Sequence, residues 1–196
     1  NRIFYKEVIS LKKAGFNVCL IAPGERDFEF EGVNIFHLKR KGGRISRMLK
    51  MSIAGVLRRA KDVNADVYHL HDPELMIAGL ILRLKGKKVV FDVHENNPAS
   101  ILSKPYIKSK IQKVLLSKAM MLMEQFAFTF FNKIVTARPD ISESLGRFRP
   151  ITLRNVPILP SLNTADKPNF VKENFSLIFV GGITSIRGVK ELIQAV

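Results

Sequence analysis

The sequence predicts an α/β fold, a mostly parallel β-sheet with helices on both faces. Apolar stretches of strand length alternate with amphipathic stretches of helix length, and the connections between them are short. Such alternation is typical of right-handed β-α-β units, which build parallel sheets. Two of the apolar stretches, residues 66–70 and 87–93, are each followed directly by a histidine and a carboxylate. Ligands bind at this edge of open α/β sheets, so the chain is a candidate enzyme domain.

The first elements follow from periodicity and from helix-breaking residues. Residues 2–14 carry apolar side chains at helical spacing, and Gly15 is the predicted C-terminal cap. Strands are predicted at residues 17–22 and 33–38. Because the first strand of such a sheet is usually central and this chain opens with a helix, we expect a further strand before Asn1.

The middle of the chain continues the alternation. The strand at residues 87–93 is apolar enough to be buried on both faces, as strands inside parallel sheets are. Proline at the first turn favours a helix that begins at Pro139. The remaining periodic segments give helices at 45–60, 74–84, 107–131 and 139–145, and strands at 66–70, 133–136 and 151–153.

The sequence changes character after residue 155. Residues 156–174 contain three prolines among Asn, Ser and Asp, a composition typical of a linker. A strand at 176–180 then runs into two glycines, and a helix opens at 187. We therefore predict a first domain at residues 1–155, a linker at 156–174 and the start of a second domain at 175–196.

Composition narrows the range of expected binding partners and cellular compartments. The 196 residues carry a formal charge of +15, from 32 Lys and Arg against 17 Asp and Glu, which favours anionic partners. The only cysteine, Cys19, excludes a disulfide framework, lies in an apolar run typical of a core, and fits a reducing compartment. No stretch has the length of a transmembrane helix, and no signal peptide is visible.

The basic residues are unevenly placed. Residues 39–61 hold nine Lys or Arg and no acid, and five lysines between 104 and 118 precede a stretch rich in Met and Phe at 119–131. This pattern favours contact with an anionic membrane surface. The alternative is a solvated helix face beside a core stripe. Nucleic acid is not expected, because aromatic residues are not interleaved with the basic ones.

The two strand ends supply the candidate site residues. His94 follows a buried strand and could contact a ligand or transfer a proton near neutral pH. Its alternative is a loop histidine that caps Asn96 or Asn97. His71 and Asp72 end the other strand, although Asp72 could simply be the N-cap of the next helix.

The sequence also bears on a metal site and on a phosphate-binding site. His69 is expected to be a core histidine with its hydrogen bonds satisfied, and no metal site is expected, since His69, His71, Asp72, His94 and Glu95 match no compact ligand spacing. Gly181 and Gly182 precede a helix with Arg187 near its start, which is a weak phosphate-binding pattern. It is neither the dinucleotide fingerprint nor the Walker motif.

Four stretches of the sequence together resemble family-4 glycosyltransferases of the two-domain GT-B fold. The pair "HLHDPE" and "VVFDVHE", within "ADVYHLHDPELMIAGLILRLKGKKVVFDVHEN", is the most specific. The stretches "RIFYKEVISLKKAGFNVCLIAPG", "ILSKPYIKSKI" and "LIFVGGITSIRGVKELIQAV" support it. The resemblance implies a Rossmann-like amino-terminal domain that mainly binds the acceptor, and a carboxyl-terminal domain that binds the donor.

The resemblance also implies an activity, that of a retaining hexosyltransferase-type enzyme. It would move a sugar from a nucleotide-diphosphate donor to a glycan or lipid-linked acceptor without a cofactor. His94 matches the cleft histidine of the family, Gly181 the glycine that opens the donor domain, and Arg187 the usual lysine that holds the diphosphate. Residues 154–157 match the segment that ends the first domain. Gly182 departs from the family, because many members have an arginine there.

These residues define the expected site and setting. His94 is the expected catalytic residue, and Gly181, Gly182 and Arg187 are expected to bind the donor. His71, Asp72 and Glu95 are expected on the acceptor side. The family's glycine-rich loop would precede Asn1 and its paired glutamates would follow Val196, so we expect the 196 residues by themselves to be inactive.

The expected setting is cytoplasmic, peripheral on the inner face of the membrane, in cell-surface polysaccharide synthesis. Three other functions stay open: a sugar-nucleotide epimerase of the same fold, a non-catalytic nucleotide-sugar-binding domain, and a nucleic-acid-binding module.

Overall fold

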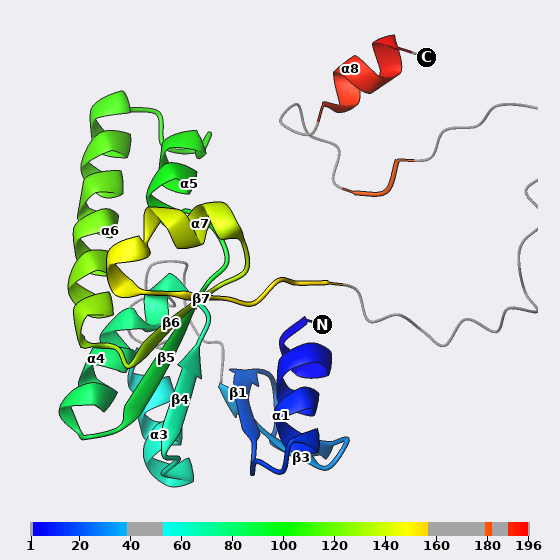
Figure 1. The fold of residues 1–196 in the computed structure, drawn as a ribbon, viewed down its shortest axis with the longest axis vertical. Helices are drawn as coiled ribbons and strands as arrows, with labels where there is room; N and C mark the ends of the chain where they lie inside the picture. Colours follow the sequence, from blue (N-terminus) through cyan, green and yellow to red (C-terminus); the bar gives the residue numbers. More distant parts are fainter. Residues whose placement is uncertain (1, 39–52, 157–178, 182–187, 196) are drawn as a thin grey trace, which may run out of the picture. The chain divides into compact units, whose positions relative to one another are not determined.

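The computed structural model describes residues 2–38, 53–156, 179–181 and 188–195, and it divides the chain into two compact units, Asn1–Ile158 and Leu159–Val196 (Figure 1). The predicted linker lies almost wholly outside the described residues. In the second unit, helix α8 (Val189–Gln194) falls within the predicted helix at 187–196, whereas residues 179 and 180 are not in a strand.

The larger sheet of the first unit has four parallel strands. They are β4 (Val67–Leu70), β5 (Lys88–Val93), β6 (Lys133–Thr136) and β7 (Ile151–Thr152), hydrogen-bonded in the order β4-β5-β6-β7. Each strand lies beside the next along the chain, as right-handed crossovers through helices produce. This sheet confirms the predicted α/β fold.

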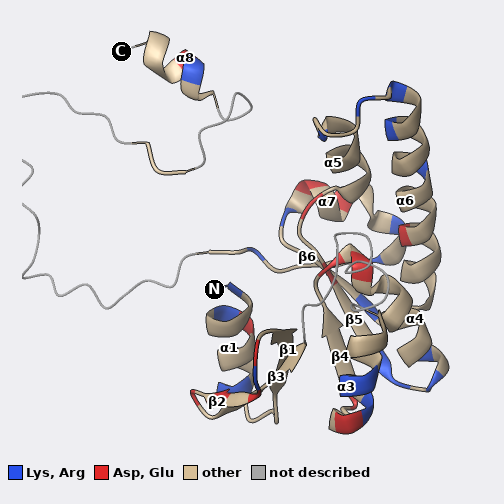
Figure 2. Ribbon diagram, turned by 180° about the vertical axis from the view of Figure 1, so that it is seen from behind, with Lys and Arg blue, Asp and Glu red and all other residues tan. Residues whose placement is uncertain are grey.

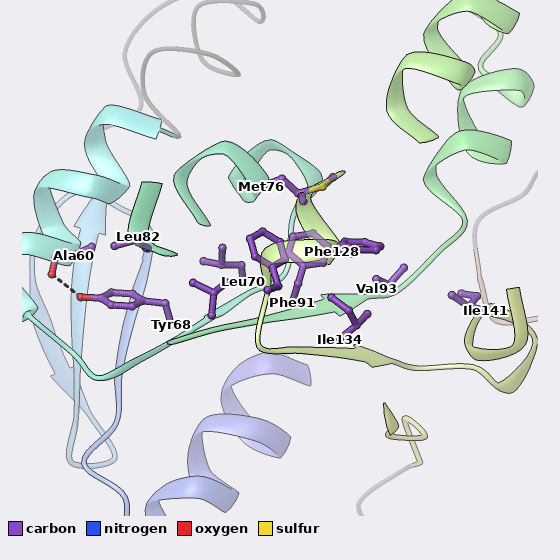
Figure 3. Packing of buried hydrophobic residues seen from close by; sticks show 13 residues of the cluster. Ala60, Tyr68, Leu70, Met76, Leu82, Phe91, Val93, Phe128, Ile134 and Ile141 are labelled. Atoms are coloured by element: carbon purple, nitrogen blue, oxygen red, sulfur yellow. Dashed lines mark hydrogen bonds between the residues drawn. The ribbon is translucent and has the colours of Figure 1, made fainter. Parts of the chain in front are cut away.

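Helices between these strands cover one face of the sheet with a hydrophobic core (Figure 3). The core joins Phe91 of β5 to Met76 and Phe128, and the hydroxyl of Tyr68 donates to the carbonyl of Ala60 at 2.7 Å. The helices that contribute buried side chains are α3 (Val56–Val63), α4 (Met76–Leu84), α6 (Lys110–Phe130) and α7 (Pro139–Ser144).

A second sheet holds β1 (Cys19–Pro23), β3 (Val33–Leu38) and β2 (Phe28–Phe30), in the order β1-β3-β2. The π-helix η1 (Ile3–Val8) and α1 (Ile9–Lys13) accompany it, and Phe4 and Val8 pack with Val33 and Ile35 in a separate small core. The described strands thus form two hydrogen-bonded sheets, of which the larger is the predicted parallel sheet.

Two elements were not predicted from sequence. Strand β2 runs antiparallel to β3, and the residues between them, Glu31 and Gly32, have φ of 52° and 65°. Positive φ at both positions is the geometry of a tight hairpin turn, and the alternation of phenylalanine with acids before it was the available signal. The second missed element is α5 (Asn97–Ser103), which Asn96 caps by accepting from the Ala99 amide at 3.0 Å.

Several predicted elements shift at their edges by one to three residues. The long helix begins at Lys110 rather than at 107, because Ser109 takes the N-cap position and accepts from the Gln112 amide. Of the helix predicted at 45–60, residues 45–52 lie outside the described part of the chain, and α3 continues to Val63. Cys19 is only partly buried, and this burial raises the pKa of its thiol.

Gly79 is required where α4 lies against the sheet. A Cβ at this position would stand 2.7 Å from Cδ1 of Leu70 and 2.9 Å from Cζ of Phe131, both closer than van der Waals contact. We expect Gly79→Ala to lower the free energy of unfolding by about 1–3 kcal/mol, as overpacked cores do. Urea denaturation of the variant measures this change.

Gly146→Ala is the matched control, because a Cβ there meets nothing within 4 Å. It should change stability by less than about 1 kcal/mol. Equal stability of the two variants would show that α4 can move away from Leu70 and Phe131 without cost.

Candidate functional site

The polar residues of β4 and β5 lie on the face of the sheet opposite the main core. Side chains alternate along a strand, so Leu70 and Phe91, which pair in register and point into the core, leave His69 and Asp92 for the other face. His71 and His94, which follow the two strands, continue this side. Glu7 of η1 and Arg2, the N-cap residue of η1, reach the same face.

The centre of the site is the carboxylate of Asp92, which is 1% exposed. Nη2 of Arg2 lies 2.8 Å from its Oδ2 and 3.2 Å from Oε1 of Glu7. A buried carboxylate is costly unless it is paired, and the guanidinium supplies that pairing for both acids. Arg2 therefore holds the end of η1 against β5.

His71 lies between the two carboxylates. Its Nε2 is 3.5 Å from Oε2 of Glu7, and its Nδ1 is 3.6 Å from Oδ2 of Asp92. The ring of His94 stacks on that of His71, with centroids 5.5 Å apart, and Nε2 of His94 is 3.4 Å from Nδ1 of His71. The two predicted strand-end histidines are thus in contact with each other.

His94 is the most accessible histidine of the cluster, with 32% of its side chain exposed. Its Nδ1 lies 2.5 Å from Nη1 of Arg2 and 3.3 Å from Oδ1 of Asp92. The alternative of a loop histidine that caps Asn96 or Asn97 is wrong, because Asn96 itself caps α5 and the His94 ring faces the cluster.

Burial and charge shift the pKa of the acids in opposite directions. Burial raises the pKa of Asp92, but the contact with His71 and the charges of His94 and Arg2 outweigh it, so that pKa lies below its usual range. For Glu7 burial dominates and, with repulsion from Asp92, raises the pKa against the pull of His71 and Arg2. The two nearby carboxyls therefore differ in acidity, with the pKa of Asp92 lowered and that of Glu7 raised.

Two histidines of the cluster, His94 and His69, are held toward the neutral form. Burial lowers the pKa of His94, and the positive charges of Arg2 and His71 add to this, while Asp92 and Asp72 oppose it. Burial, followed by the charge of His71, lowers the pKa of His69 to about 4. A neutral imidazole can both donate and accept, which suits contact with hydroxyl-rich ligands.

His69 differs from its prediction as a satisfied core histidine. Its Nε2 is buried and has no hydrogen-bond partner among the described residues, and its Nδ1 is 4.0 Å from Oε2 of Glu7. It stacks on the His71 ring at 4.5 Å between centroids. Its role in the structure is therefore packing against His71 rather than hydrogen bonding.

Other predicted site residues lie outside this cluster. Asp72 and Glu95 are exposed, and Asp72 occupies the N-cap position before η3 (Pro73–Leu75) without a side-chain cap bond, so only its backbone carbonyl accepts, from Leu75. Gly181 is exposed with φ of 153°. Gly182 and Arg187 lie outside the described residues.

The segment that leaves the first unit contacts the same short helix. Nζ of Lys6 on η1 donates to Oδ1 of Asn155 and to the carbonyl of Val156, both at 2.6 Å. Asn155 and Val156 belong to the segment that resembles the end of the family's first domain. Helix η1 therefore contacts both the histidine and carboxylate cluster and the segment at residues 155–156.

Sequence reasoning missed Arg2, Glu7 and Asp92 as site residues. Asp92 had a signal, because a carboxylate inside an otherwise apolar strand must be paired once that strand is buried. Arg2 and Glu7 had none, since their positions depend on how η1 meets the sheet. A hollow lined by Glu25, Arg26, Phe28 and Glu29 lies at β2 and contains no predicted site residue.

The metal set weighed from sequence is not the one that the fold brings together. Ligand atoms of Glu7, His69, His71 and Asp92 lie within 4.8 Å of one another, whereas Asp72 and Glu95 stay outside. Two histidines and two carboxylates are suitable ligands for a divalent cation. In this structure Arg2 already provides the positive charge between the two carboxylates.

The lowered pKa of the partly buried His69 predicts a pH dependence of stability. Its folded pKa of about 4 lies below the ordinary histidine pKa of 6.5, so the unfolded chain binds more protons between these values and stability falls as the pH falls. The loss should reach up to about 3 kcal/mol at pH 4, from 1.36 kcal/mol for each pKa unit. Urea denaturation between pH 7 and 4 measures it.

The variant His69→Gln should lose less stability over the same pH range, because it has no imidazole to protonate on unfolding. His94 acts in the same direction in both proteins, so some dependence remains. Parallel stability curves for the two proteins would contradict the assignment to His69.

Comparison with known proteins agrees with the fold. Ten chains among solved structures match. One is a sucrose-phosphate synthase from Thermosynechococcus elongatus, 11% identical with a TM-score of 0.57, and the similarity covers 79% of this chain and 42% of that one. The present chain thus spans less than half the length of that structure. At this identity the similarity shows the fold, a Rossmann-like half of a GT-B architecture.

A search of curated proteins found no match. The sequence matches the family Glycosyltransferase Family 4 over residues 2–161, which is most of its length. Together with the parallel sheet and the histidines at its carboxyl edge, this match assigns the chain: it belongs to glycosyltransferase family 4.

Proposed function

We propose that this chain is the acceptor-side part of a retaining glycosyltransferase of hexosyltransferase type. The enzyme moves a sugar from a nucleotide-diphosphate donor to a glycan or lipid-linked acceptor in cell-surface polysaccharide synthesis. The observation that carries the proposal is the partly exposed His94, in contact with Arg2 and the buried Asp92, at the carboxyl edge of a parallel sheet in a member of this family.

Each proposed residue has a role that follows from its chemistry. His94 contacts the sugar or the acceptor, because its imidazole is the accessible end of the cluster. His71, Asp72 and Glu95 face the acceptor side, and Gly181, Gly182 and Arg187 bind the donor diphosphate in the domain that begins after a linker at 156–174. Positive groups such as Arg187 would stabilise the departing diphosphate.

The test of His94 is the substitution His94→Gln in the full-length enzyme. We expect kcat to fall about a hundredfold or more, the range for removal of a positioned acid, base or hydrogen-bond donor. The measurement follows both nucleotide release and glycoside formation with a nucleotide sugar and an acceptor. A product that is an epimerised sugar nucleotide would instead support the epimerase alternative.

His37→Gln is the matched control. His37 lies on β3 in the other sheet, its ring contacts Asp27, and the Nη2 of Arg59 lies 3.0 Å from the same carboxylate. This variant should keep full transfer activity. Unchanged transfer in His94→Gln would remove the proposed role of His94.

We further propose that the enzyme contacts an anionic membrane through α6. The helix packs on the core with one side, through Glu124, Ala127 and Phe128. Its other side carries large apolar residues at helical spacing, namely Ile111, Leu115, Leu122, Phe126 and Phe130, which are 49–73% exposed. No helix in the described part of the chain is long and apolar enough to cross a membrane.

The positive charge near the exposed apolar row of α6 supports a lipid surface as its binding partner. Lysines lie along α6 and in the loop before it, as Figure 2 shows in blue, and they are Lys104, Lys108, Lys110, Lys113 and Lys118. An apolar row beside lysines can insert into the interface while the lysines meet anionic headgroups. This location fits a cytoplasmic enzyme at the inner face of the membrane that acts on a lipid-linked acceptor.

Co-sedimentation with phosphatidylglycerol vesicles tests this surface. We expect Leu122→Ser/Phe126→Ser to weaken binding about tenfold or more, because two partly exposed apolar side chains no longer enter the lipid. Binding of the unchanged chain should weaken with salt, since surface charges are screened.

The control Phe16→Ser/Leu84→Ser removes the same residue types at exposed positions outside α6, 62% and 89% exposed, and should bind as the unchanged chain does. Equal loss in both double variants would indicate non-specific hydrophobic adsorption. DNA or RNA binding without vesicle binding would support the nucleic-acid alternative.

A further inference from the structure

The Nδ1 atom of His94 faces one hydrogen-bond donor and one hydrogen-bond acceptor. Nη1 of Arg2 lies 2.5 Å away, and Oδ1 of Asp92 lies 3.3 Å away. A guanidinium can only donate a hydrogen bond, and a carboxylate only accept one. Nδ1 must therefore be bare to accept from Arg2, or carry a hydrogen to donate to Asp92, and it cannot do both.

The geometry favours Arg2. Its contact with Nδ1 is the shorter of the two, and its guanidinium is fixed from the other side by Asp92 at 2.8 Å and Glu7 at 3.2 Å. Oδ1 of Asp92 has no hydrogen-bond partner among the described residues. Asp92 therefore acts on His94 through Arg2, which it holds in place.

We propose that Arg2 is a positioning residue that keeps His94 neutral, with its only proton on Nε2. The geometry of the cluster is sufficient for this tautomer, and only its catalytic consequence rests on the proposed function. A neutral imidazole with the proton on Nε2 offers a donor at the end of the ring away from Arg2. It cannot act as a cation toward an approaching ligand.

The neighbouring histidine is consistent with this assignment. Nε2 of His94 lies 3.4 Å from Nδ1 of His71, so a proton on the first requires a bare nitrogen on the second. His71 then carries its proton on Nε2, which is 3.5 Å from the Oε2 of Glu7, an acceptor. This assignment of protons fits the contacts of His94 with Arg2 and with His71, and it leaves Nδ1 of His71 without a proton toward Oδ2 of Asp92, 3.6 Å away.

Charged groups from each packed element act on His94. Arg2 on η1 and His71 after β4 favour its neutral form, whereas Asp92 on β5 and Asp72 favour its charged form. Without Arg2, its positive charge would no longer oppose the carboxylates, which favour the charged form of His94. The imidazole would then take a proton on Nδ1 and donate it to Oδ1 of Asp92.

The experiment is nitrogen-15 NMR of the histidine rings in the 196-residue chain, with a pH titration. In the unchanged chain we expect a bare nitrogen signal for Nδ1 of His94 and a protonated one for Nε2. In Arg2→Met we expect the Nδ1 signal to become that of a protonated nitrogen, and the titration midpoint of His94 to move to higher pH. Arg2→Lys keeps the charge and should restore part of the original midpoint.

Arg138→Met is the matched control, because Arg138 forms an exposed ion pair with Asp140 on α7, at 2.7 Å, and has no contact with the cluster. Backbone amide spectra show whether each variant is folded, and Arg2→Lys provides a second folded variant if Arg2→Met is not. A protonated Nδ1 in the unchanged chain would overturn the proposal. So would an identical tautomer and midpoint in a folded Arg2→Met.

This readout is independent of sugar transfer. If His94→Gln keeps full transferase activity while the NMR result is as expected, the proposed function of His94 fails and the positioning role of Arg2 stands. If both hold, the acid side of the pH profile of kcat should move to higher pH in Arg2→Met of the full-length enzyme. A purely structural role of Arg2 would lower kcat without moving that profile.

Discussion

The polar half of this structure depends on the burial of one negative charge, the carboxylate of Asp92, in the middle strands of a parallel sheet. An unpaired charge at such a position would be strongly destabilising, and removal of one partner from a buried pair typically costs about 3–5 kcal/mol. Arg2 meets this requirement from a different part of the chain, and Glu7 and His71 follow because they contact the same two groups. The site is therefore also a connection between η1 and the sheet.

The two faces of β4 and β5 differ in role, because one packs in the hydrophobic core and the other carries the polar site residues. One face carries Leu70 and Phe91 into a hydrophobic core that needs no polar partner. The other face carries the histidines and Asp92, and the ion pair with Arg2 offsets the cost of burying the Asp92 carboxylate there. Because the alternation of a strand is strict, a polar face of this kind can change in function while the core behind it stays the same.

Much of the fold could be predicted, because its signals are local. The parallel strands β4 to β7 and the helices α4, α6 and α7 between them follow from apolar runs, from periodicity and from breakers such as Pro139. The short hairpin strand β2, the helix α5 and the division into two sheets were missed. The site was predicted only in part: His71 and His94 stand at visible strand ends, whereas Arg2 and Glu7 reach it by tertiary contact. Asp72 was expected at the site, yet chain direction after β4 leaves its side chain exposed.

The π-helical form of η1 has a consequence for how tolerant this segment is to change. The Ile9 amide bonds to the carbonyl of Phe4, five residues back, so the turn holds one residue more than in an α-helix. In a regular α-helix, residues five apart face directions about 140° apart, and Arg2 and Glu7 would diverge. The wider turn keeps them on one side, 3.2 Å apart, while Phe4 and Val8 still share the buried side. Loss or gain of a single residue in η1 would therefore damage the charge network while leaving a helix that still looks amphipathic.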